Sequence, residues 1–107
     1  MVTSDGSKVL TLEGEIDLHV SPNVARDLQA MAKAKPPRLI VDLTRVSYID
    51  SSGLAVLLDR MQQVEYYGGK FYLAGAGEGL RTVFESSRLD QVFRIQPDLE
   101  SALQATV

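Results

Sequence analysis

Apolar residues follow two different spacings along the chain, and these spacings predict strands and helices in turn. From Lys8 to Ile16 apolar side chains are mixed with Thr and Glu, which is typical of a half-buried strand. Within it, Gly14 indicates a bulge or the strand's end. The run from Leu39 to Leu43 is short, apolar and partly β-branched, as expected for a central strand buried on both faces. Further strands are predicted at residues 71–74 and 92–95, and a loop at 44–50.

Apolar residues spaced three or four positions apart predict a helix after each strand. The first has Ser21 as its N-cap and Pro22 as its first helical residue, and ends at Lys33. The second, from Ser51 to Tyr67, is the clearest, with an apolar stripe made of Leu54, Leu57, Leu58, Met61 and Val64. The last two follow the glycines 75, 77 and 79 and the Pro97-Asp98 pair. Their apolar faces are made of Leu80, Val83 and Phe84, and of Leu99, Ala102 and Leu103.

The order of these elements predicts the fold class. Strands that alternate with helices through short loops imply a largely parallel sheet with right-handed crossovers. A chain of 107 residues is long enough for one hydrophobic core and too short for two. The sequence therefore predicts a single α/β domain that covers residues 1–107.

Composition and charge narrow the kind of partner. The formal net charge is -3 and Lys and Arg form no cluster, which argues against nucleic acid, because its affinity comes largely from neutralised phosphates. A protein partner is favoured instead. The N-terminus has no signal pattern, and no apolar run approaches the roughly 20 residues that cross a bilayer. The absence of Cys excludes disulfides and thiolate metal sites and fits a reducing cytosol. We therefore expect a cytoplasmic protein without direct membrane insertion.

The sequence has no motif that is typical of a catalytic, metal or cofactor site. The chain has one His, no Cys and no GxSxG elbow, so a nucleophile with a neighbouring base is missing. His19 lies beside Asp17, but two residues cannot complete a metal or acid/base site, and a surface or loop-packing role is favoured. The glycines from Gly75 to Gly79 lack the spacing of a dinucleotide fingerprint, so a plain loop is favoured over a nucleotide site. We expect no enzymatic activity, no cofactor and no metal.

The segment Asp50-Ser51-Ser52-Gly53 places a carboxylate and two hydroxyls at the start of the most apolar helix. One interpretation is an N-cap, in which Asp50 or Ser51 accepts hydrogen bonds from the first turn. The other concerns Ser52, whose position favours an added phosphate through free N–H groups and the helix dipole. In this second interpretation, Gly53 leaves the turn uncrowded for an approaching kinase. The residues alone leave both interpretations open.

The run from Asp42 to Leu54, DLTRVSYIDSSGL, resembles the signature of the STAS family, especially its anti-sigma factor antagonists. The upstream segment Leu12 to Asp17, LEGEID, resembles the second hallmark of the family at a matching distance. Together with the element order, the resemblance spans nearly the whole chain. It implies a mixed, mainly parallel sheet of four to five strands with helices packed on one face.

The resemblance also implies a phosphorylation-controlled binding module and no catalysis. In that family the second serine of the motif, here Ser52, accepts phosphate from an anti-sigma factor serine kinase, and a phosphatase removes it. The unphosphorylated form binds the kinase, and the sigma factor is released. The partner-binding residues implied here are Asp17, Asp50, Ser51, Ser52 and Gly53. We expect a monomer in the free state.

Two features leave an alternative open. Relatives carry an extra edge strand before Lys8, for which only Met1 to Thr3 remains here. STAS domains also serve as scaffolds of stressosomes and as subunits of ABC-type transport systems. Ser52 favours the switch over these roles without excluding them.

Overall fold

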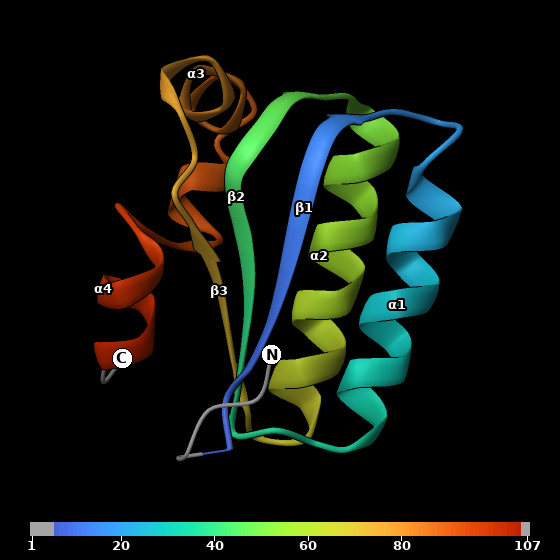
Figure 1. The fold of residues 1–107 in the computed structure, drawn as a ribbon, viewed down its shortest axis with the longest axis vertical. Coiled ribbons are helices and arrows are strands. Elements are labelled where there is room, and N and C mark those ends of the chain that lie inside the picture. Colours follow the sequence, from blue (N-terminus) through green and yellow to red (C-terminus); the bar gives the residue numbers. More distant parts are fainter. Residues whose placement is uncertain (1–5, 106–107) are drawn as a thin grey trace.

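The computed structural model describes residues 6–105 of the chain, and its strands form one sheet in the order β1-β2-β3-β4 (Figure 1). The strands are β1 (Lys8–Ile16), β2 (Arg38–Ile49), β3 (Lys70–Ala74) and β4 (Arg94–Gln96). All three neighbouring pairs are parallel, which confirms the predicted α/β class. Within the described residues the sheet is wholly parallel rather than mixed. The extra edge strand considered at Met1 to Thr3 lies outside them.

The helices divide unequally between the two faces of the sheet (Figure 1). They are α1 (Ser21–Lys33), α2 (Ser51–Tyr66), α3 (Glu78–Ser86) and α4 (Leu99–Gln104), with a 3₁₀ turn at Leu89–Gln91. The first three contribute to the main core, as expected for helices on one face. Against that expectation, α4 covers the opposite face, where Ala102 packs on Ile40 and Tyr72. Side chains alternate along a strand, so both faces of β2 and β3 need cover.

Each face has its own apolar cluster. Leu39, Val41 and Leu43 of β2 join the large cluster under α1, α2 and α3, whereas Ile40 between them faces α4. The guanidinium of Arg38 donates to the backbone oxygens of Leu103 and Ala105, and so ties the end of α4 to β2. The last helix is thus fixed by both apolar packing and hydrogen bonds.

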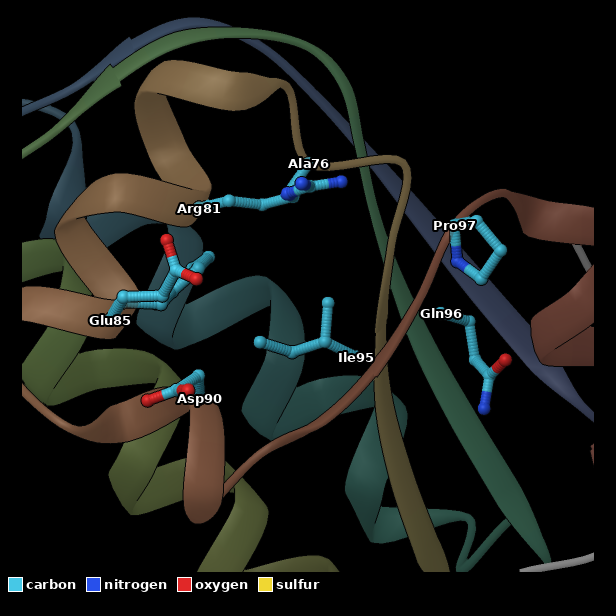
Figure 2. Close-up of a pocket in the computed structure, with 8 residues that line it drawn as sticks. Ala76, Arg81, Glu85, Asp90, Ile95, Gln96 and Pro97 are labelled. Atoms are coloured by element: carbon cyan, nitrogen blue, oxygen red, sulfur yellow. The ribbon is translucent and has the colours of Figure 1, made fainter.

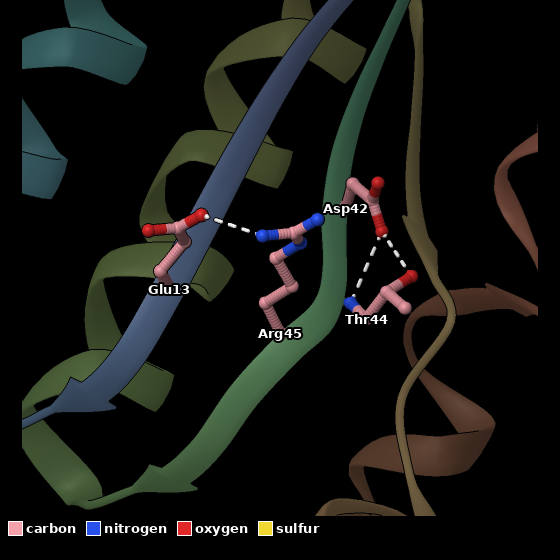
Figure 3. Close-up of polar contacts among 4 residues, drawn as sticks. All are labelled: Glu13, Asp42, Thr44 and Arg45. Carbon is pink, nitrogen blue, oxygen red and sulfur yellow. Dashed lines mark hydrogen bonds and ion pairs between the residues drawn. The ribbon is translucent and has the colours of Figure 1, made fainter.

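The second strand is longer than the sequence predicts, because residues 44–49 continue β2 instead of forming a loop. Between the pairs Thr11 with Asp42 and Glu13 with Arg45, β2 advances one residue more than β1, and it does so again after Gly14. Gly14, with a φ of 76°, lies on β1 at the second of these shifts, but the extra residue of the bulge belongs to β2. Glu13 and Arg45 form an ion pair across this stretch, while Asp42 accepts hydrogen bonds from the backbone and hydroxyl of Thr44 (Figure 3).

Two predicted boundaries also shift. Ser21 is the first residue of α1 and Val20 its N-cap, so the prediction of Ser21 as N-cap was wrong by one residue. The fourth strand begins at Arg94, because Leu89–Gln91 forms a turn of 3₁₀ helix. Phe93, predicted within the strand, is buried against Phe84 at the edge of the core.

Candidate functional site

The paired ends of β1 and β2 bring the two predicted motifs together. Ile16 and Ile49, the last residues of the two strands, are register partners, and the Asp50 N–H donates to the Ile16 oxygen at 3.2 Å. Because the strands are parallel, Asp17 and Asp50 leave the sheet at the same edge. The bulges in β2 make this possible, since they let the longer strand end level with β1.

Asp50 is the N-cap of α2. Its Oδ1 accepts from the N–H groups of Ser52 at 2.9 Å and Gly53 at 3.3 Å, and from the Ser52 hydroxyl at 2.5 Å. The pKa of the Asp50 carboxyl lies below its usual value, chiefly because the Ser52 hydroxyl donates a hydrogen bond to it. Desolvation opposes this shift, and the backbone N–H groups of Gly53, Ser52 and Leu18 add to it. Ser51 is exposed and takes no part in these hydrogen bonds. Of the two predicted N-cap residues, Asp50 is therefore the one that caps α2.

Ser52 is half-buried, and its hydroxyl has a second neighbour from another helix. The Ser21 Oγ lies 2.8 Å from the Ser52 Oγ and 2.7 Å from the backbone oxygen of Asp17. Ser21 is only 3% exposed. This contact of Ser21 was not predicted from the sequence. One signal was available in the sequence: Ser21 follows Asp17 by four residues, and Asp17 follows β1 directly. This spacing places the Ser21 hydroxyl near the end of β1, where Ser52 also lies.

Asp17 shapes the loop between β1 and α1. Its Oδ1 accepts from the backbone N–H groups of His19 at 3.0 Å and Val20 at 3.2 Å. The link from Asp17 to Ser52 runs through Ser21 and the backbone oxygen of Asp17. His19 is exposed, in agreement with the predicted surface role, and Leu18 beside it is 72% exposed.

Gly53 lets the start of α2 sit against the strand ends. It is buried, and a Cβ at this position would lie 2.7 Å from the Cγ1 of Ile49 and 3.0 Å from the Cγ2 of Ile16. The lack of a side chain at Gly53 therefore allows close packing against Ile49 and Ile16 in the interior. The prediction was instead that Gly53 leaves space on the surface for an approaching kinase.

Comparison with known proteins identifies the family. Residues 1–102 match the sequence profile of the STAS domain. The chain belongs to the STAS domain family. This STAS domain is 31% identical to the anti-sigma-B factor antagonist of Listeria monocytogenes over 83 residues, which are 78% of this chain and 73% of that protein.

Two solved structures extend the likeness to the fold. An anti-sigma factor antagonist from Mycobacterium paratuberculosis is 29% identical, with a TM-score of 0.86 over 95% of this chain and 86% of that one. The phosphorylated form of the Bacillus cell fate determinant SpoIIAA is 28% identical, with a TM-score of 0.74 over 97% and 93%. The STAS fold of this chain is thus shared with both.

A separate cavity of about 300 Å³ lies beside α3, the 3₁₀ turn and β4 (Figure 2). Its lining includes Arg81 with the carboxylates Glu85 and Asp90, and none of the residues around Ser52. In the nearby glycine loop of this STAS domain, Gly75 donates its N–H to the Gln96 oxygen, and a Cβ there would overlap the hydroxyl of Thr44. Gly75 thus has a packing role, as expected for a plain loop.

Two other features of the STAS domain bear on its chemistry. Within residues 6–105, no three His, Asp or Glu side chains are grouped so that they could hold a metal ion. In the same part of the chain, every helix is too short or too polar to span a membrane.

Proposed function

We propose that this STAS domain is an anti-sigma factor antagonist that binds an anti-sigma factor kinase while Ser52 is free and releases it once Ser52 is phosphorylated. The observation that carries the proposal is the hydrogen bond of 2.5 Å from the Ser52 hydroxyl to the Asp50 carboxylate. This bond places a half-buried hydroxyl and an ionised acceptor together at the start of α2.

The names of the relatives support the class of partner. The Listeria monocytogenes protein is named an anti-sigma-B factor antagonist, and SpoIIAA has been solved in a phosphorylated form. The likeness to each covers more than two thirds of both chains. We therefore infer an anti-sigma factor as the partner, in the cytoplasm where sigma factors act.

Phosphoryl transfer from ATP fits the groups around Ser52. The Ser52 Oγ forms a bond to the γ-phosphorus, the bond from that phosphorus to the β,γ-bridging oxygen breaks, and ADP leaves. The hydroxyl proton passes to the Asp50 carboxylate, which already accepts it in a hydrogen bond. The kinase supplies the ATP site and the stabilisation of the transferred charge.

The same groups explain how a phosphate would reverse binding. The phosphate adds about 1.5 to 2 negative charges next to Asp50, whose carboxylate already occupies the N–H groups of Ser52 and Gly53. In the free protein, water and the dipole of α2 stabilise the added charge. In a complex the water is excluded, and the unpaired charge opposes association. A phosphatase that removes the phosphate resets the switch.

Phosphorylation in vitro tests the proposal. The purified protein is incubated with ATP and candidate anti-sigma factor kinases from its own genome, and any phosphate is located by mass spectrometry. We expect one phosphate, on Ser52, which is lost in Ser52→Ala and kept in Ser51→Ala. Labelling that survives Ser52→Ala would overturn the site. Equal affinity of the kinase for the phosphorylated and free forms would overturn the switch and favour a scaffold or transporter role.

A further inference from the structure

We propose that Ser21 is a positioning residue for phosphorylation, which holds the Ser52 oxygen by donating a hydrogen bond to it. The inference rests on the proposed function of Ser52. It arises from the contact of 2.8 Å between the two hydroxyl oxygens, which come from helices α1 and α2.

The hydroxyl protons are too few for the short contacts around them. Ser21 lies 2.7 Å from the Asp17 oxygen and 2.8 Å from the Ser52 Oγ, and the Ser52 Oγ lies 2.5 Å from the Asp50 carboxylate. These are three contacts, and each hydroxyl supplies one proton. One contact is therefore always without a proton, and the network has more than one arrangement.

The strengths of the acceptors decide where the protons lie. The ionised carboxylate of Asp50 is the strongest acceptor, so Ser52 donates to it. The proton of Ser21 then goes either to the Ser52 Oγ or to the Asp17 oxygen. That oxygen already accepts from the backbone N–H groups of Val20 at 3.1 Å and Ser21 at 2.9 Å. It can lose the hydroxyl of Ser21 and remain satisfied, so the Ser21 proton is available to the Ser52 Oγ.

This arrangement orients the reacting oxygen. The proton of the Ser52 Oγ points to Asp50 and one lone pair is held by Ser21, so the second lone pair is left for attack on phosphorus. Ser21 is 3% exposed, which keeps water from replacing it. A near-attack geometry of this kind contributes to the rate of the step rather than to binding.

Kinetics of phosphorylation test the role of Ser21. In Ser21→Ala, we expect kcat for phosphorylation of Ser52 to fall by about tenfold to a hundredfold, with KM for the protein changed less than about twofold. The control is Ser86→Ala, which removes a bond of the same kind, from a hydroxyl to the backbone oxygen four residues earlier. Its kinetics should equal those of the wild type. Ser21→Thr, which keeps the hydroxyl, should restore kcat.

Nuclear magnetic resonance tests the geometry without a kinase. We expect three-bond couplings of Ser52 to report a single side-chain rotamer in the wild type and an averaged one in Ser21→Ala. An averaged Ser52 rotamer in the wild type, or a folded Ser21→Ala with wild-type kcat, would overturn the proposal. If no kinase phosphorylates Ser52 in the wild type, the proposed function fails, while the rotamer measurement still decides whether Ser21 holds Ser52.

Discussion

A Cβ atom at Gly53 would lie 3.0 Å from the Cγ2 of Ile16, so the first turn of α2 and the last residue of β1 meet without spare room. The same Cβ would lie 3.1 Å from the backbone oxygen of Ile16, which cannot turn aside as a side chain can. The position of Ser52, one residue earlier, depends on this close approach.

Replacement of Gly53 by Ala should therefore destabilise the domain. We expect Gly53→Ala to lower the free energy of unfolding by about 1 to 3 kcal/mol, as overpacking of a tight site does. The control is Gly79→Ala in α3, where a Cβ meets nothing within 4 Å. It should be neutral or stabilising by up to about 1 kcal/mol. Urea unfolding measures both, and equal stabilities of the two variants would contradict the packing role of Gly53.

Two neighbouring leucines of α2 should differ in cost. Leu57 is 1% exposed in the main core, whereas Leu58, which the sequence placed on the same apolar stripe, is only half-buried. Leu57→Ala should cost about 2 to 5 kcal/mol of stability, and Leu58→Ala clearly less. Thermal unfolding of both variants measures the two losses of stability. A larger loss in Leu58→Ala than in Leu57→Ala would contradict this prediction and show that Leu58 anchors the helix.

The Asp50 carboxyl should make stability depend on pH. Its pKa in the folded protein is below the usual value of 3.8, chiefly because Ser52 donates to the charged form. The unfolded chain thus binds the proton first as the pH falls, so this contribution to stability is complete above about pH 4 and is lost as the pH falls through the lower folded-state pKa. Asp50→Asn keeps a capping side chain but does not titrate. Between pH 7 and pH 2.5, the urea midpoint of the wild type should fall further than that of Asp50→Asn.

A negative charge at Ser52 should prevent partner binding without unfolding the domain. Ser52→Asp should weaken binding to the anti-sigma factor kinase by about a hundredfold or more, since each 1.4 kcal/mol of penalty is a factor of about ten. Ser52→Ala should bind like the unphosphorylated wild type. Gln62→Glu adds a charge to an exposed position in the second half of α2 and serves as the control. Titration calorimetry that finds Ser52→Asp and Gln62→Glu equally tight would contradict the electrostatic switch.

The sequence predicts the order of elements well, because the strands and helices carry clear apolar spacings. The sequence shortens β2, because Leu43, Val46 and Ile49 recur every third residue where bulges shift the strand, and this hides the alternation typical of a strand. The sequence does not determine which face of the sheet α4 covers. An apolar stripe indicates that a helix packs against the sheet but not on which of its two faces.

The sequence names the residues of the candidate site but does not show the contacts between them. The structure places Asp17 and the motif residues 50–53 at one edge of the sheet. The role of Ser21 was hidden, because a serine before a proline has the pattern of an N-cap, and only the register of β1 with β2 shows what its hydroxyl faces.

The packing of α4 on its own face of the sheet also bears on how the chain matures in the cell. While the protein is being synthesised, β1, β2 and β3 emerge before residues 99–104, so the main core can close under α1 and α2 first. In a chain that has not yet placed α4, we expect Ile40 and Tyr72 to lack this cover on the other face. We expect such a chain to offer an apolar surface to chaperones or to other nascent chains until α4, fixed by Arg38, packs against the sheet.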